Sequence, residues 1–268
     1  MSSPVVVVSF FLLVILTIWW AILGPFSPVP ETESARYLWG GFYQIMAYWG
    51  GINGLLIARK WGGFKSILGR ALLAFSIGLL CQGFGQSVYT FYLFYLGIEA
   101  PYPSLGDLGY FGTIPFYIYG VVLLARVIGV RVSVQSYVKK MQAVLIPVVM
   151  LVVSYVLFLR YYEFDFSTPI KTFLDFGYPL GQAIYVSLAI LALLLSRNVL
   201  GGMMRYPILI LLIALVAQYL ADYIFLYEFN KEEWYVGGLN DYMYLFSYFL
   251  MAVGIANVGV AFKRITQT

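Results

Sequence analysis

The sequence contains no histidine, and this absence excludes several kinds of functional site. Histidine is the most common ligand of metal ions and haem, and it is the usual general base near neutral pH. We therefore expect no zinc or haem site and no catalytic triad. Every lysine falls between the long apolar runs or near their ends, so a retinal bound as a buried Schiff base is not expected either.

Cysteine and charge are also scarce. Cys81 is the single cysteine, so no disulfide can form within the chain. Charged residues make up 10% of the 268 residues and hydrophobic residues 62%, whereas a soluble domain carries roughly 25% charged residues. A water-soluble fold of this length cannot cover so much apolar surface, so the sequence predicts that the chain lies in a lipid bilayer.

Motifs for soluble catalysis are missing as well. The sequence has no Walker loop and no glycine fingerprint for dinucleotides at the start of a helix. Only short tails flank the first and last apolar runs, so no soluble output domain is expected. We expect no enzyme and no nucleic-acid partner, although a membrane enzyme that uses carboxylates alone stays open as an alternative.

Eight apolar runs are long enough to cross a bilayer. A helix needs roughly 20 residues to span about 30 Å of hydrocarbon, and backbone amides in lipid must find partners within the same segment. The runs cover residues 4–26, 38–58, 71–97, 107–125, 141–159, 172–195, 207–229 and 239–262. The expected fold is an all-α integral membrane protein with eight transmembrane helices in one domain, residues 1–268.

The charges between the predicted spans separate by sign. The segments after the second, fourth, sixth and last spans contain Lys and Arg but no Asp or Glu. The opposite segments carry the acids Glu31, Glu33, Glu99, Glu163, Asp165, Glu232 and Glu233. Cytoplasmic loops are enriched in Lys and Arg, so both termini are predicted to be cytoplasmic.

A short pattern recurs at the start of three spans. It reads SLGDLGYF at 104–111, TFLDFGYP at 172–179 and GLNDYMYL at 238–245. Each copy has Asp followed by Tyr three residues later, which gives Asp107 with Tyr110, Asp175 with Tyr178, and Asp241 with Tyr244. The spans before two of them also match, with Gln82 and Gln86 corresponding to Gln218 and Asp222. We interpret the chain as four helical-hairpin repeats that all point the same way.

The Asp-Tyr pairs have two interpretations. Ser104 to Asp107 and Thr172 to Asp175 fit the capping pattern of a helix start, and Gly238 can cap the third helix. In the alternative interpretation, the acids and phenols form an outward-facing ring that receives a cation or a polar ligand.

The polar residues inside the spans also have two interpretations. Gln82 and Gln86 are four residues apart and share a helix face, as do Gln218 and Asp222. Asp222 lies roughly 10 Å inside its span, and an acid within the membrane is by default a functional-site hypothesis. The alternative is a set of hydrogen bonds between the third and seventh spans. The dense Tyr and Phe at the outer ends of these spans indicate interface anchoring, or stacking of a quinone, carotenoid or other flat lipid.

Two stretches, PYPSLGDLGY at 101–110 and LDFGYPLGQAI at 174–184, resemble the polytopic membrane-sensor regions of prokaryotic diguanylate cyclases and histidine kinases. The resemblance covers about residues 80–260. No kinase or cyclase domain follows the last predicted span here. The resemblance therefore implies a module of a prokaryotic plasma membrane that acts through other proteins.

Three functions stay open on this reasoning. The first is a sensor-like or receptor-like module that binds a small or lipidic ligand from the outer side and works with partner chains or as a homo-oligomer. The second is an accessory or structural subunit of a larger membrane complex. The third is a transporter coupled to protons or cations, which the repeats and the intramembrane acid favour.

Overall fold

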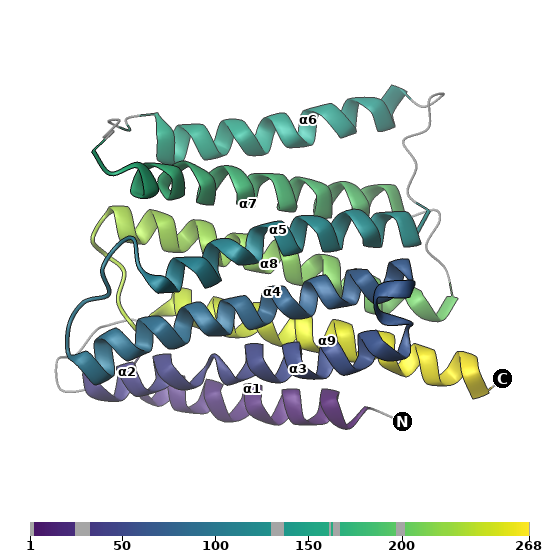
Figure 1. Ribbon diagram of the computed structural model, residues 1–268, viewed down its shortest axis with the longest axis horizontal. Coiled ribbons are helices and arrows are strands. Elements are labelled where there is room, and N and C mark those ends of the chain that lie inside the picture. Colours follow the sequence, from purple (N-terminus) through teal and green to yellow (C-terminus); the bar gives the residue numbers. More distant parts are fainter. Residues whose placement is uncertain are drawn as a thin grey trace.

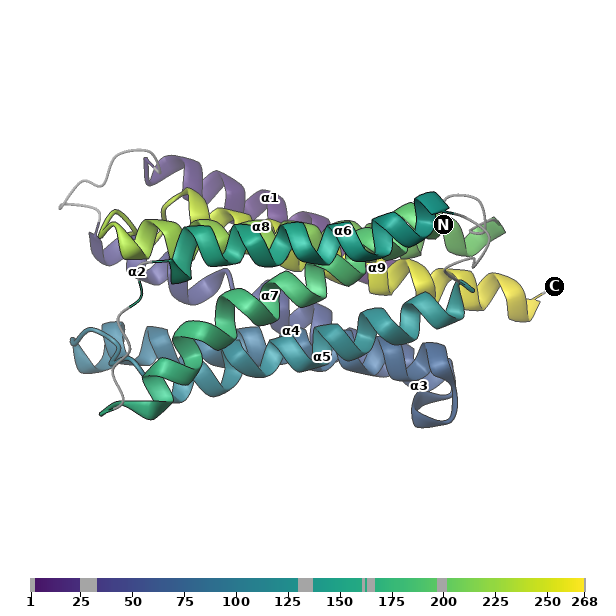
Figure 2. The ribbon, with the colours of Figure 1, turned by 90° about the horizontal axis from the view of Figure 1, so that it is seen from above.

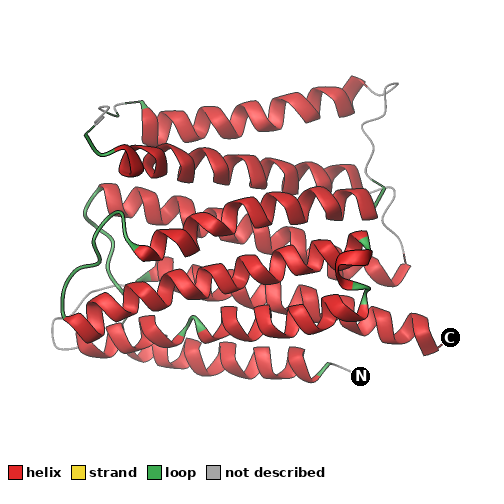
Figure 3. Cartoon of the chain, in the orientation of Figure 1, coloured by secondary structure: helices red, strands yellow, loops and turns green. Residues whose placement is uncertain are grey.

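The computed structural model describes residues 3–24, 33–129, 137–160, 162, 167–196 and 202–267. Every regular element in these residues is a helix, as Figure 3 shows, which confirms the predicted all-α class. The helices are α1 (Pro4–Ile22), α2 (Glu33–Phe42), α3 (Ile45–Lys60), η2 (Gly63–Lys65), α4 (Ile67–Thr90), η3 (Phe91–Leu96), α5 (Leu105–Val127), α6 (Tyr137–Ser154), η4 (Tyr155–Leu159), α7 (Pro169–Ser196), η5 (Gly202–Met204), α8 (Arg205–Asn230) and α9 (Leu239–Gln267).

Seven helical segments of the described chain are long and apolar enough to cross a membrane. They are Pro4–Ile22, Ile67–Leu96, Leu105–Val127, Tyr137–Leu159, Pro169–Leu195, Gly202–Asn230 and Leu239–Arg264. These segments indicate an integral membrane protein with the bilayer as its surroundings. Each overlaps one of the predicted spans; the last two residues of the first prediction, 25 and 26, lie outside the described residues.

The prediction of one continuous helix over 38–58 was wrong. The chain turns at Tyr43 and Gln44, between the end of α2 and the start of α3. Two glycines precede the turn, and the Gln44 side chain supports it by donating from Nε2 to the Gly41 carbonyl at 2.6 Å. From the neighbouring helix α4, Ser87 Oγ donates to Gln44 Oε1 at 2.8 Å. Neighbouring side chains thus satisfy the polar groups of the break, the condition for tolerating an interrupted helix in an apolar setting.

The helices lie side by side and alternate in direction (Figure 1). Taken together, α2 and α3 run from one end of the bundle to the other, between α1 and α4. The start of α1 and the end of α9 lie at the same end. Viewed from above, α7 crosses the bundle diagonally (Figure 2), and it packs against α5, α6 and α8.

The two ends of the bundle differ in charge. We call one the basic end, since its described residues include Arg59, Lys60, Lys65, Arg70, Arg126, Lys139, Lys140, Arg205, Lys263 and Arg264. The other is the acidic end, with Glu33, Glu99, Glu228, Glu232 and Glu233. Glu31, Glu163 and Asp165 lie outside the described residues. Arg36, a base at the acidic end, is buried and donates to the carbonyls of Leu23 and Gly24, so it caps the end of α1.

Glycines bring α4 and α5 into backbone contact. A Cβ atom added to Gly109 would lie 2.5 Å from the carbonyl oxygen of Cys81 and 2.6 Å from the backbone nitrogen of Gly85. Backbone atoms of a packed helix cannot move aside as a flexible side chain can. Gly112, one turn further along α5, is different, because its nearest neighbour would be the Cys81 sulfur at 3.7 Å.

Gly109 and Gly112 should differ in how substitution by alanine changes the stability of the protein. Gly109→Ala should force α4 and α5 apart and lower the free energy of unfolding by about 1–3 kcal/mol. Gly112→Ala, the matched control, should be neutral or stabilise by up to about 1 kcal/mol through helix propensity. Unfolding by SDS in mixed micelles, followed by circular dichroism, measures both. Equal effects at the two positions would contradict the close contact.

Candidate functional site

The polar residues inside the bundle are brought together by α9. Tyr248 on α9 donates its hydroxyl to Gln82 Oε1 on α4 at 3.2 Å. Ser247, the preceding residue, donates to Gln218 Oε1 on α8 at 2.7 Å. Both glutamines are buried, as the shared helix faces predicted. The expected direct bonding between the third and seventh spans was wrong, because α9 lies between α4 and α8 and bonds to each.

Asp222 has a hydrogen-bond partner at both carboxylate oxygens. The Tyr185 hydroxyl on α7 donates to Oδ2 at 2.7 Å, and Gln218 Nε2 donates to Oδ1 at 3.0 Å. The carboxylate is 6% exposed, and Tyr244 on α9 interacts with it as well. In the part of the chain that the structure describes, no lysine or arginine forms an ion pair with this acid. Asp222 therefore ties α7, α8 and α9 together by neutral donors alone.

Gln86 plays the corresponding part in the α4–α5 hairpin. Its Oε1 accepts from the Tyr110 hydroxyl at 2.8 Å, and its Nε2 donates to the Gly40 carbonyl at 3.2 Å. The contact between Gln86 and Tyr110 has the same place in this hairpin as the contact between Asp222 and Tyr244 has in the α8–α9 hairpin. Gln86 also reaches the broken helix, because Gly40 lies on α2 just before the turn.

The helix-start interpretation is correct for Asp107. The Ser104 backbone N–H donates to Asp107 Oδ2 at 2.7 Å, and the two residues form a capping box at the start of α5. The second oxygen accepts from the Tyr178 hydroxyl on α7 at 2.6 Å. Asp107 thus caps its own helix and joins it to α7.

The same interpretation is wrong for Asp175. α7 begins at Pro169, a residue suited to the first helical position, so Thr172 is already inside the helix and its N–H donates to the Thr168 carbonyl. Asp175 instead accepts from the hydroxyls of Tyr102 at 2.7 Å and Tyr162 at 2.8 Å. Burial, and next the bond to Asp175, raise the pKa of Tyr102 above its ordinary range, so this phenol keeps its proton and donates at neutral pH.

Asp241 lies buried at the start of α9, and Tyr244 packs in the interior of the bundle. Neither lines an open ligand site at the acidic end. Asp241 is 3% exposed and accepts from the Gly237 backbone N–H at 2.8 Å, just before the start of α9. Tyr244 lies one turn deeper and its ring centroid is 6.1 Å from that of Tyr248. The three Asp-Tyr pairs therefore do not share one environment. Asp107 and Asp175 accept from tyrosines of other segments, whereas Asp241 accepts from the Gly237 backbone N–H just before its own helix.

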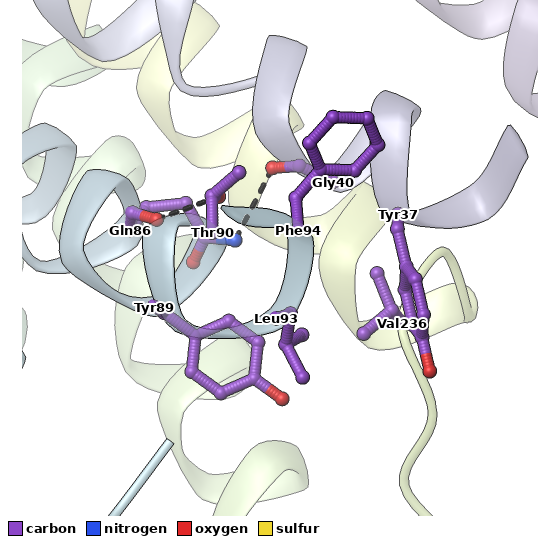
Figure 4. Close-up of a pocket in the computed structure, with 8 residues that line it drawn as sticks. All are labelled: Tyr37, Gly40, Gln86, Tyr89, Thr90, Leu93, Phe94 and Val236. Carbon is purple, nitrogen blue, oxygen red and sulfur yellow. Dashed lines mark hydrogen bonds between the residues drawn. The ribbon is translucent and has the colours of Figure 1, made fainter. Parts of the chain in front are cut away.

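A small pocket opens at the acidic end beside Gln86 (Figure 4). It is lined by Tyr37, Gly40, Gln86, Tyr89, Thr90, Leu93, Phe94 and Val236. Its volume is about 10 Å³ for the centre of a water-sized sphere, close to the least that one water needs. Figure 4 shows the Gln86 amide at one side and the rings of Tyr89, Phe94 and Tyr37 around the others. The hydrogen bond from Tyr37 to Glu33 raises the pKa of Tyr37 to about 12, so this phenol keeps its proton at neutral pH.

Sequence reasoning found Gln86 but missed the pocket. Its walls come from three separate segments, α2, the end of α4 with η3, and the residues before α9. The available signal was the aromatic stretch over residues 87–97, in which η3 is a π-helix. Single π turns inside helices are frequent at functional sites.

No protein-family model, curated protein or solved structure matches the chain. Within the described residues, no three His, Cys, Asp or Glu side chains are grouped so that they could hold a metal ion. The side chains gathered in the bundle interior and around the pocket offer hydroxyl, amide and carboxylate groups in an aromatic setting.

The Asp222 geometry predicts a graded response to substitution. Asp222→Leu leaves the Tyr185 hydroxyl and the Gln218 amide buried without an acceptor, so the free energy of unfolding should fall by about 1–3 kcal/mol. Asp222→Asn retains one acceptor oxygen and should cost less. SDS unfolding of both variants, each with and without Tyr185→Phe, gives a double-mutant cycle. Tyr185→Phe should cost stability beside Asp222 and should regain part of the lost stability beside Leu, where it removes the unpaired hydroxyl. Equal costs in both backgrounds would refute the bond.

Proposed function

We propose that this chain is a non-enzymatic, receptor-like membrane module that binds a small or lipidic ligand at its acidic end and acts through partner chains. The observation that carries the proposal is the pocket beside Gln86. Aromatic and aliphatic walls with a single amide and a backbone carbonyl match the usual make-up of small-molecule sites, which are mostly apolar with few polar groups. The aromatic rings suit a flat ligand, such as a quinone or carotenoid end group, and because the pocket has room for about one water, its walls must move apart to admit such a group.

Gln86 supplies a route from the pocket to the rest of the bundle. It joins α4 to α2 through Gly40 and to α5 through Tyr110. A ligand group that bonds to the Gln86 amide competes with the Gly40 carbonyl. The break at residues 43–44 separates α2 from α3, so α2 can shift without moving the whole crossing. Ligand occupancy would then be converted into a displacement at the acidic end that a partner chain detects.

The proposal includes eight crossings with both termini in the cytoplasm of a prokaryotic plasma membrane. Support comes from the path of α2 and α3, which together run the length of the bundle, and from the basic charge at the end where α1 starts and α9 finishes. The four-hairpin repeat is supported by the matching places of the Gln86–Tyr110 and Asp222–Tyr244 contacts.

An accessory subunit of a membrane complex is the second candidate. The full hydrogen bonding of Asp222 favours it, since a carboxylate paired at both oxygens serves structure without any ligand. A proton- or cation-coupled transporter is the third, and it would require Asp222 for transport rather than for stability alone.

Cysteine labelling tests the topology. In a Cys81→Ala background, Glu33→Cys stands at the start of α2 and Lys60→Cys at the end of α3, and both sites are exposed. A membrane-impermeant maleimide should label Glu33→Cys in intact cells and Lys60→Cys only after permeabilisation. Labelling of both from one side would mean that α2 and α3 enter and leave on the same side, which leaves seven crossings. The reverse pattern would overturn the orientation.

Native mass spectrometry of gently extracted protein tests the ligand. The wild-type chain should carry a small bound mass, and Leu93→Trp, which fills the pocket, should lose it. Ile213→Trp, an exposed position on α8, is the matched control and should retain it. Stoichiometric partner chains without any small mass would favour the accessory subunit. A small mass retained by Leu93→Trp would place the ligand elsewhere.

A further inference from the structure

The helix α6 stands at the edge of the bundle (Figure 1). It packs against α7 and its own continuation η4. Only 6% of the most apolar stretch of Tyr137–Leu159 is buried, against 67% for Ile67–Leu96. This helix therefore presents most of its apolar surface to whatever surrounds the protein.

A groove runs along the part of α6 nearest the basic end. It is shallow and open to the surroundings, with a volume of about 400 Å³, and its described lining residues all belong to α6: Tyr137, Lys140, Met141, Val144, Leu145 and Val148. These positions recur at intervals of three and four residues, so they form one stripe on the helix surface. The first turn contributes a phenol and an ammonium group, and the rest of the stripe is entirely apolar.

The length of the groove matches one leaflet of a bilayer. From Tyr137 to Val148 the helix rises by roughly 16 Å at 1.5 Å per residue. The hydrocarbon core of a bilayer is about 30 Å thick, so one leaflet contributes about half of that. The groove starts at the basic end and stops near the middle, where an acyl chain from that leaflet also stops. Exposed apolar side chains continue beyond the groove to Leu157, so the positive charge at the head of the groove, rather than its length alone, favours a lipid over a partner helix.

The charge at the head of the groove is uniformly positive. Lys140 is exposed and Lys139 precedes it, and the segment between α5 and α6 contains no Asp or Glu. Tyr137 is 79% exposed, which suits an aromatic side chain in the headgroup region. Phe64 beside Lys65 and Tyr206 beside Arg205 repeat this pairing of an exposed aromatic residue with a base at the same end.

We propose that this groove is a binding site for one anionic phospholipid of the leaflet at the basic end. An acyl chain lies along Met141, Val144 and Val148, and the phosphate of the headgroup contacts the Lys140 ammonium. A zwitterionic phospholipid offers the same chains without net negative charge. It gains the apolar contacts and lacks the additional attraction to Lys139 and Lys140.

Lipid titration followed by native mass spectrometry of the full chain in detergent tests this site. The probes are phosphatidylglycerol and phosphatidylcholine with identical acyl chains. The wild-type protein should bind one phosphatidylglycerol about 30-fold more tightly than phosphatidylcholine, as two lysines near the surface imply. Lys139→Gln with Lys140→Gln should abolish the preference. Arg59→Gln with Lys60→Gln removes an equal charge from the end of α3 and should leave the preference for phosphatidylglycerol unchanged.

A second variant tests the groove rather than the charge. Val144→Trp is at a position 67% exposed, so it fills the groove without entering the core, and it should weaken binding of both lipids. Loss of the preference in both charge variants would show a general attraction of the basic end and would overturn the site. Full binding by Val144→Trp would also overturn it. A dimer mass that Val144→Trp abolishes, with no retained lipid, would assign this face to a second copy of the chain.

Discussion

A hydrogen bond between a tyrosine hydroxyl and an acceptor on another segment is the interaction on which this bundle depends. Lipid offers no partner to a polar side chain, so each polar group in the interior must find one inside the protein. The chain has 24 tyrosines, and the hydroxyls of six of them bond to five acids and glutamines on other segments. The pairs are Tyr102 and Tyr162 with Asp175, Tyr178 with Asp107, Tyr110 with Gln86, Tyr248 with Gln82, and Tyr185 with Asp222.

Tyrosine suits this task because its ring packs as an apolar body and its hydroxyl lies at the far end. The donor therefore reaches an acceptor across a helix interface without opening a polar gap around it. The same geometry needs helices that approach closely, which the glycines of α4 and α5 permit. Gly109 lies against the backbone of α4. One turn further along α5, the Thr113 hydroxyl donates to the Gly78 carbonyl of α4. Close approach and hydroxyl bonding thus support each other along one interface.

The two ends of the bundle offer different chemistry. At the acidic end, neutral tyrosines and one amide surround a pocket whose wall includes a broken helix. At the basic end, an exposed helix combines a lysine pair with an apolar stripe as long as one leaflet. The proposed receptor-like function would use both surfaces, the pocket to take up a ligand and the stripe on α6 to hold a lipid. The apolar middle, closed by paired polar groups, separates them.

The amino-acid sequence by itself determined the all-α class, the places of the apolar helices and the separation of charge between the two ends. Hydropathy and charge are properties of a local stretch, so they can be read without knowing its neighbours. The sequence also placed Gln82 with Gln86, and Gln218 with Asp222, on shared helix faces, because helical spacing alone sets which residues share a face. That these faces are buried follows from the packing of the bundle. Tertiary structure decided the break between α2 and α3, the partners of Asp175 and the walls of the pocket. A hydrogen bond such as that between Tyr185 and Asp222 depends on how two helices are rotated and staggered against each other. Packing of the whole bundle sets those quantities, and no local pattern records them.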